Sequence, residues 1–197
     1  MEKPKFSIEK RAFESPVTLS PDEGSRKVEG YAALFDVESS DLYGMTETIE
    51  RGAFDGVIQR SDVLCLMNHD DRRGALARST NGEGSLSLEV DDKGLKYSFE
   101  APHSTLGDEL LESLKRGDIR ASSFAFTVKE EEWKDEGETL RRKVIKIDEL
   151  YDVSPVFRPA YEDTTVYARG KQITAVPDKA AELQITKELD NLKSEIL

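Results

Sequence analysis

Residues 86 to 99 read Leu86-Ser87-Leu88-Glu89-Val90-Asp91-Asp92-Lys93-Gly94-Leu95-Lys96-Tyr97-Ser98-Phe99, and this stretch decides the fold class. Apolar and polar residues alternate on both sides of the turn-forming segment 91–94. Successive side chains of a β-strand point to opposite faces, so the alternation predicts two strands that each bury one face. With a short turn between them they form a β-hairpin. The stretch therefore indicates a core built from sheets.

The segment that follows the hairpin, residues 105–116, predicts the clearest helix of the chain. Thr105 is a candidate cap at its start, and Gly117 ends it. Its apolar stripe consists of Leu110, Leu111 and Leu114. A shorter helix is expected at 53–60, where three large apolar residues recur at helical spacing.

Further strands are expected on both sides of this region. Alternating or continuous apolar runs predict strands at 28–35, 46–50, 62–67, 119–128 and 140–151. Many short strands with few helices favour an α+β fold, and we expect a closed or nearly closed antiparallel β-barrel with a few peripheral helices.

The two ends of the chain differ in character from its middle. Residues 1–27 are charged and contain three prolines, and we expect a hairpin or an ordered N-terminal arm there. Residues 170–197 carry apolar residues at the spacing of an amphipathic helix, namely Ile185, Leu189, Leu192 and Ile196. That tail is expected to dock either onto the domain or onto a partner.

The overall charge limits the classes of partner. The chain has 197 residues, a formal net charge of -12 and a sequence pI near 4.8. An acidic surface repels phosphate backbones and anionic lipids, so we expect neither nucleic acid nor membrane as a partner. The first residues are charged rather than apolar, and no run approaches the roughly 20 apolar residues of a membrane span. We expect a protein that is cytoplasmic at synthesis.

Cysteine and histidine are both scarce. The single cysteine, Cys65, excludes an intramolecular disulfide and lies in an apolar run, which favours a buried packing role. The two histidines are His69, which follows the predicted strand 62–67, and His103, which precedes the long helix. No spacing of His or Cys residues is typical of a zinc site, and we expect no metal or cofactor.

A serine pair offers a candidate nucleophile. In the strand that contains Phe124 and Phe126, alternation places Ser123 on the face opposite to the two aromatic rings. A serine nucleophile needs a base within hydrogen-bond reach, and His69 at a strand end is a candidate. A surface histidine and an ordinary strand serine remain the alternatives that the residues alone allow.

The base of such a site usually needs a third group that holds its tautomer. Three acids follow the serine in the sequence and are candidates for that role: Asp148, Glu149 and Asp152. Spacing alone does not choose among them.

Several segments resemble, in order, the motifs of the prohead proteases of tailed bacteriophages, a family related in fold to the herpesvirus assembly proteases. The resemblance covers residues 28–169, which we take as the protease domain. The segments that carry it are Gly30–Phe35, Glu47–Phe54, Leu66–Asp70, Leu95–Pro102 with the helix that ends at Lys115–Asp118, Ser122–Phe126, and Asp152–Val156 with Pro159–Tyr161. Each is weak alone, whereas their common order is specific.

Residue by residue, the resemblance places the family's histidine on His69 and its serine on Ser123. Ser122 is the adjacent alternative, because the doubled serine leaves the register open by one residue. The herpesvirus relatives use a second histidine after the serine, and this chain has none there. An acid must then complete a triad, and Asp152 occupies the acidic position of the closing motif. Arg158 is a candidate donor to the oxyanion.

The resemblance implies a serine endopeptidase of capsid maturation. Its expected substrates are the scaffolding segment of the major capsid protein, or a separate scaffold, and the protease itself. The expected location is the host cytoplasm, inside the immature capsid. Whether the chain forms a homo-oligomer is left open. Residues 170–197 would be a removable or scaffold-docking tail. The alternatives are a catalytically silent assembly factor of the same fold and a small β-barrel binding module.

Overall fold

The computed structural model describes residues 8–13, 17–22, 24–39, 42, 45–137, 139–157, 166–168 and 171–173. Strands dominate this part of the chain, together with one α-helix, α1 (Thr105–Arg116), and the 3₁₀ helices η1 (Ile58–Arg60) and η2 (Asp71–Arg73). The strands are β1 (Glu9–Phe13), β2 (Thr18–Leu19), β3 (Lys27–Leu34), β4 (Met45–Ile49), β5 (Asp62–Cys65), β6 (Ala77–Thr80), β7 (Glu83–Gly84), β8 (Leu86–Val90), β9 (Gly94–Glu100), β10 (Ala121–Asp135), β11 (Leu140–Val156), β12 (Val166–Ala168) and β13 (Lys171–Ile173).

The hairpin predicted at 86–99 is confirmed as β8 and β9. The two strands pair antiparallel from Leu86 opposite Phe99 to Val90 opposite Leu95. They belong to a four-stranded sheet in the order β2-β3-β9-β8. Alternate side chains of β9 are buried, as the period of two requires.

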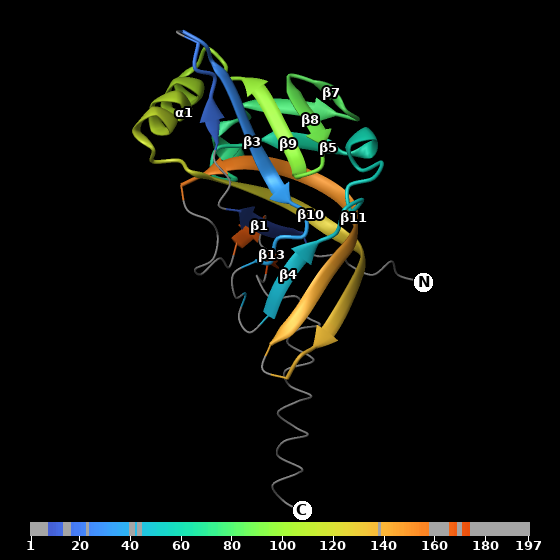
Figure 1. The fold of residues 1–197 in the computed structure, drawn as a ribbon. Helices are drawn as coiled ribbons and strands as arrows, with labels where there is room; N and C mark the ends of the chain where they lie inside the picture. The colour runs from blue at the N-terminus through green and yellow to red at the C-terminus, as the bar shows by residue number, and fades with distance from the viewer. Residues whose placement is uncertain are drawn as a thin grey trace, which may run out of the picture.

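A second hairpin, β10–β11, crosses the molecule under this sheet and extends beyond it next to β4 (Figure 1). Both strands continue past the ends that the alternation predicts. Register shifts between Ala125 and Glu131 interrupt the pairing. Such irregularities let a long strand bend, and they explain why β10 can serve both the core and the protruding end of the hairpin.

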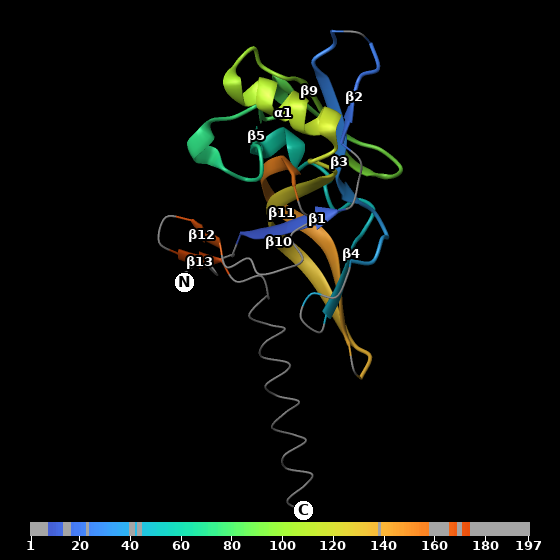
Figure 2. The same cartoon turned by 90° about the vertical axis from the view of Figure 1, so that its left-hand side faces the viewer.

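The core lies between the two sheets. Phe124 and Phe126 of β10 are fully buried and stack with ring centroids 4.5 Å apart, on the face opposite to Ser123 as predicted. From the four-stranded sheet, Val28, Leu86, Tyr97 and Phe99 belong to the same buried cluster. Figure 2 shows β1 alongside β10 and β3 above them.

The closed barrel that we expected is not confirmed. The strand pairings give a seven-stranded sheet, β1-β10-β11-β5-β6-β7 with β4 on β11, and the separate four-stranded sheet. The pairings are also not all antiparallel, since β4 and β5 run parallel to β11. The alternation of apolar and polar residues shows only that each strand buries one face. Strands of a closed barrel and strands of two packed sheets share this pattern, so the sequence could not distinguish the two architectures.

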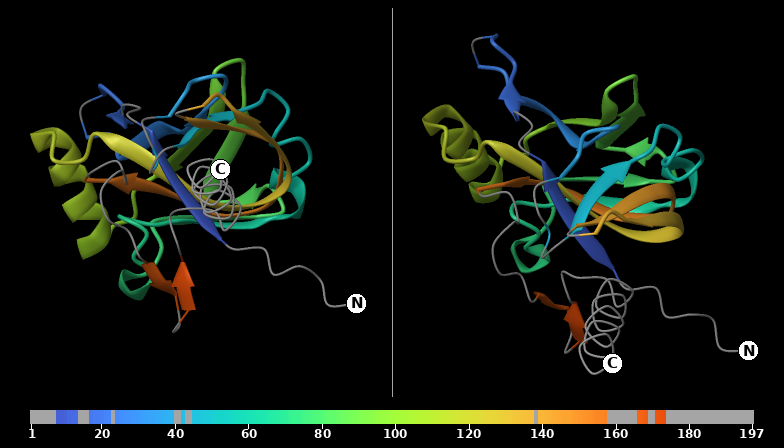
Figure 3. Two further views of the ribbon diagram at one scale, coloured as in Figure 1. Left: turned by 90° about the horizontal axis from the view of Figure 1, so that it is seen from below. Right: turned by 60° about the horizontal axis from the view of Figure 1, so that its bottom comes forward.

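The long helix is confirmed with a small shift of its cap. Ser104, not Thr105, caps α1, and its hydroxyl accepts a hydrogen bond from the Gly107 amide at 3.2 Å. Gly117 ends the helix in the left-handed conformation, with φ of 75°. Figure 3 shows α1 at the periphery of the molecule.

The short helix predicted at 53–60 is wrong as an α-helix. The segment forms successive turns, and only η1 is helical. Gly56 adopts a φ of 66°, which interrupts a right-handed helix. Phe54, Val57 and Ile58 are nevertheless buried, so the spacing identified the correct face.

The predicted N-terminal arm contains β1 and β2, but they do not form a hairpin with each other. β1 pairs with β10, and β2 pairs with β3. The amphipathic helix predicted within 170–197 lies outside the described residues. In the described part of the chain, no helix has the length and apolar character needed to cross a membrane.

Candidate active site

Two neighbouring serines of β10 point in opposite directions. The Ser123 hydroxyl lies 2.6 Å from Nε2 of His69, and the residue is fully buried. The Ser122 hydroxyl lies 2.9 Å from the phenol oxygen of Tyr97, inside the core. The structure therefore brings Ser123 to the histidine and leaves Ser122 on the other face of the strand.

His69 lies in a tight turn after β5. The Leu66 and Asn68 amides still bond to carbonyls of β11, at 3.2 and 2.9 Å, and then the chain turns away. Asn68 and His69 have φ of 57° and 59°, the left-handed region that non-glycine residues rarely adopt. Such strain costs on the order of 1–3 kcal/mol for each residue and concentrates at functional sites. The turn is what aims the imidazole back over the sheet.

Asp152 completes the arrangement from the next strand. Its Oδ1 lies 2.6 Å from Nδ1 of His69 and accepts a hydrogen bond from the Ser154 hydroxyl at 2.7 Å. On β11, Asp152 pairs with Leu64 on one side and with Ala125 on the other. The carboxylate is therefore held between β5, which leads to the histidine, and β10, which carries the serine.

The other two candidate acids lie elsewhere. The Glu149 carboxylate accepts a hydrogen bond from Tyr151 at 2.9 Å and is exposed. The Asp148 carbonyl accepts hydrogen bonds from Arg60, at 2.9 and 3.2 Å. Neither makes a contact with His69 that would compete with Asp152.

This geometry has the elements that acyl-transfer chemistry needs. A carboxylate next to Nδ1 keeps a proton on that nitrogen, so Nε2 of the neutral ring is available as an acceptor. A hydroxyl within 2.6 Å of Nε2 can deliver its proton there as its oxygen attacks a carbonyl carbon. In the part of the chain that the structure describes, no group of three or more His, Cys, Asp or Glu residues is arranged to hold a metal.

A buried ion-pair network next to the site was not predicted from the sequence. Arg11 of β1 binds Glu47 of β4 through two nitrogens, at 2.8 and 3.1 Å. Arg142 of β11 binds Glu9 of β1 through two nitrogens, at 2.5 and 2.8 Å, and also Glu47 at 2.7 Å. Burial by itself would raise the pKa of Glu9, but the two arginines hold that pKa below its ordinary value of 4.5. Charged residues in strands usually indicate a face exposed to solvent, but these charged side chains are buried.

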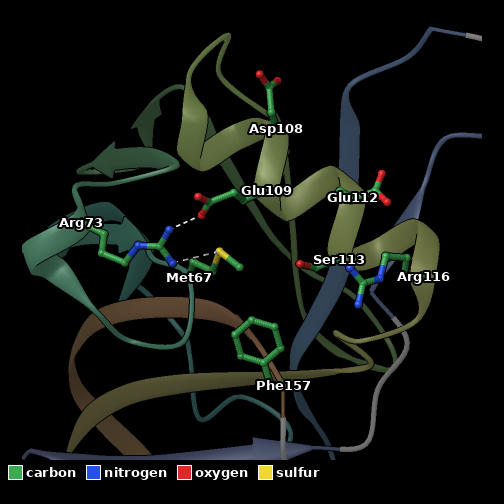
Figure 4. A pocket seen from close by; sticks show the side chains of 8 residues that line it. All are labelled: Met67, Arg73, Asp108, Glu109, Glu112, Ser113, Arg116 and Phe157. Atoms are coloured by element: carbon green, nitrogen blue, oxygen red, sulfur yellow. Dashed lines mark hydrogen bonds and ion pairs between the residues drawn. The ribbon is translucent and has the colours of Figure 1, made fainter.

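A surface hollow of about 500 Å³ opens between α1 and the loop that carries His69 (Figure 4). Arg73 reaches across it to Glu109 of α1. Phe157, an exposed aromatic residue directly after β11, lies on another side, near Met67. His69, Ser123 and Asp152 do not line it.

The remaining residues that the sequence singled out lie away from this chemistry. Cys65 is buried, and burial raises the pKa of its thiol well above the ordinary value, which fits the predicted packing role. His103 is exposed in the loop before α1. Arg158, the candidate oxyanion donor, lies outside the described residues.

Comparison with known proteins adds the family. The model of the caudovirus prohead serine proteases matches residues 14–179. Among solved structures, the capsid assembly protease gp21 of bacteriophage T4 is similar in fold, with a TM-score of 0.50 and 12% sequence identity. The similarity covers 79% of this chain and 99% of that one. A search of curated protein sequences finds no match. Because the family model spans most of its length, the chain belongs to the caudovirus prohead serine proteases.

Proposed function

We propose that the chain is an active serine endopeptidase with Ser123 as nucleophile, His69 as general base and Asp152 as the residue that orients the base. The observation that supports this most strongly is the pair of 2.6 Å contacts on the two nitrogens of one imidazole. Three elements far apart in the sequence converge there. A hydroxyl on one ring nitrogen and a carboxylate on the other is the arrangement that a serine nucleophile, its base and an orienting acid require.

The mechanism follows from that geometry. Nε2 of His69 takes the proton of Ser123 as Oγ attacks the scissile carbonyl carbon, and Asp152 stabilises the imidazolium that forms. The protonated ring then gives its proton to the leaving amine, which departs and leaves an ester on Ser123. A water molecule that loses its proton to the same nitrogen hydrolyses the ester. The cycle returns the serine hydroxyl and the neutral histidine.

The substrate that fits the family is a capsid component. We infer that the chain cleaves the scaffolding segment of the major capsid protein, or a separate scaffold, within the immature capsid. We also infer self-cleavage that removes residues 170–197. Support comes from the family match and from the fold shared with the capsid assembly protease of bacteriophage T4.

Co-expression with the major capsid protein of the same phage tests the proposal. Wild type is compared with Ser123→Ala, and the intact mass of both proteins is measured. Shortened capsid protein, or a shortened protease, in the wild-type sample alone is expected. Full-length masses in both samples would overturn the proposal and favour an assembly factor that keeps the fold without the activity.

A further inference from the structure

Ser154 of β11 lies next to two members of the proposed triad. It follows Asp152 by two residues, and alternate side chains of a strand share a face. Across the ladder Ser154 pairs directly with Ser123 of β10, and Asp152 pairs in the same way with Ala125. Residues that lie directly opposite each other in antiparallel strands also share a face. These side chains therefore form the corners of a square on the face of the sheet over which His69 lies.

His69 connects one diagonal of this square. Its Nε2 lies 2.6 Å from the Ser123 hydroxyl, and its Nδ1 lies 2.6 Å from Oδ1 of Asp152. Ser154 and Ala125 occupy the other two corners. Of these two side chains, only that of Ser154 can form a hydrogen bond.

The Ser154 hydroxyl donates its proton to the carboxylate of Asp152. The distance to Oδ1 is 2.7 Å, and Ser154 is fully buried. Oδ1 is also the oxygen that accepts the hydrogen bond from Nδ1 of His69. A rotation of the carboxylate away from the imidazole would therefore stretch both hydrogen bonds at once. The bond from Ser154 thus raises the cost of every misaligned position of Asp152.

Burial makes this second hydrogen bond important. Asp152 is only 7% exposed, and a buried carboxylate needs hydrogen bonds that replace those to water. In the described part of the chain, the hydrogen bonds to this carboxylate come from His69 and Ser154. Hydrogen bonds to an ionised acceptor are stronger than those between neutral groups. The Ser154 hydroxyl therefore stabilises the negative charge of Asp152 and also fixes its position.

The two serines that face each other have different roles for the same reason. A hydroxyl has a single proton, and that of Ser154 is donated to a carboxylate rather than to a base. Both nitrogens of the imidazole already have partners, Ser123 and Asp152. Ser154 can therefore act on the reaction through Asp152, but it is not placed to attack a substrate.

We propose that Ser154 is a positioning residue of the protease, which holds Asp152 in the orientation that His69 requires. The site then consists of a chain of hydrogen bonds from Ser154 through Asp152 and His69 to Ser123. The inference rests on the proposed function of Ser123. It assigns to Ser154 a contribution to the rate of the chemical step and none to substrate binding.

Cleavage kinetics with the major capsid protein of the same phage test this role. In Ser154→Ala we expect kcat to fall about 10-fold, the scale of one hydrogen bond to a charged group. KM should stay unchanged, because the buried hydroxyl does not contact the substrate. Equal kcat values for Ser154→Ala and wild type would overturn the inference. Absence of cleavage in wild type would instead count against the proposed function.

Ser79→Ala is the matched control. Ser79 is an equally buried serine of strand β6, and its hydroxyl has no hydrogen-bond partner among the residues that the structure describes. The control should cleave like wild type. An equal loss of kcat in Ser79→Ala and Ser154→Ala would contradict a specific role, because removal of any buried hydroxyl would then have the same effect.

A double-mutant cycle tests whether Ser154 acts through Asp152. In Asp152→Asn the charged acceptor of the Ser154 hydroxyl is already lost. Adding Ser154→Ala should then change kcat by less than about twofold, since the two residues belong to one chain of hydrogen bonds. A further loss of about 10-fold in this background would overturn the inference, because Ser154 would then act independently of Asp152.

The orientation of the histidine can also be observed without catalysis. NMR of the imidazole nitrogens in full-length Ser123→Ala reports which nitrogen of His69 carries the proton, and the exposed His103 gives an ordinary histidine for comparison. We expect the Nδ1 proton in this background and a mixture of tautomers when Ser154→Ala is added. Adding Ser79→Ala instead should leave the spectrum unchanged. An identical His69 spectrum with and without the Ser154 hydroxyl would contradict the inference even if Ser123 is the nucleophile.

Discussion

The Tyr97 ring lies directly over Gly30, across the pairing of β9 with β3. A Cβ added at Gly30 would be 2.7 Å from the phenol oxygen of Tyr97 and 2.9 Å from its ring carbon Cε1. The same phenol oxygen also forms a hydrogen bond with the Ser122 hydroxyl, at 2.9 Å. The aromatic ring thus links the backbone of the four-stranded sheet to the strand that carries Ser123.

We predict that Gly30→Ala destabilises the fold. The new methyl group has no room, since Tyr97 is fully buried, and overpacking of a core costs about 1–3 kcal/mol. Chemical denaturation measures the change. Ala32→Gly on the same strand is the contrasting variant, because it removes a methyl group rather than adding one. A Gly30→Ala variant as stable as wild type would contradict the close contact.

A second prediction separates the two serines. Ser122→Ala leaves the buried phenol of Tyr97 without its partner, which costs about 1–3 kcal/mol of unfolding free energy. Adding Tyr97→Phe removes both polar groups, and most of that loss should be recovered. Cleavage by both variants should stay near wild type at temperatures where they are folded. Complete inactivity of folded Ser122→Ala would transfer the nucleophile to that residue.

The role of Asp152 can be tested by an isosteric change. Asp152→Asn keeps the volume but replaces the acceptor of the His69 Nδ1 proton with an amide, which favours the wrong tautomer. In a triad this change lowers kcat by about 10⁴-fold. Cleavage kinetics, with Glu149→Gln as control, give the measurement. Equal activity of the two variants would exclude Asp152 as the orienting acid.

The attachment of β1 should depend on pH through Glu9. Its pKa in the folded protein lies below the ordinary 4.5, so its contribution to stability is full above pH 4.5. The contribution is lost as the pH falls through the lowered value. Wild type should exceed Glu9→Gln by about 1–3 kcal/mol of unfolding free energy at neutral pH, and the difference should shrink below pH 4.5. A pH-independent difference would contradict the charged interaction with Arg142.

Local patterns predicted local structure well in this chain. The alternation in 86–99 and the leucine spacing in 105–116 report one buried face each, and a hairpin and a helix need little more. The resemblance to the phage proteases added the positions of His69, Ser123 and Asp152, which the structure brings together although 54 and 83 residues separate the histidine from its two partners.

The sequence did not predict which strands pair with one another when they are far apart in the chain. The parallel placement of β4 and β5 on β11 depends on which edges remain after the hairpins form, and alternation says nothing about partners. The burial of the charged residues Arg11, Glu47 and Arg142 could not be predicted for a related reason. A charged residue in a strand indicates a solvated face unless its counter-ions are known, and these come from three separate strands.

Covalent labelling of the purified chain with a fluorophosphonate, followed by peptide mapping, tests most directly whether Ser123 and His69 form a catalytic centre. A single adduct on Ser123 is expected in wild type and in Ser122→Ala. His69→Ala should show strongly reduced labelling, because the serine then lacks its base. An adduct at another residue, or equal labelling of Ser123 with and without His69, would contradict the claim that these two side chains form the catalytic centre.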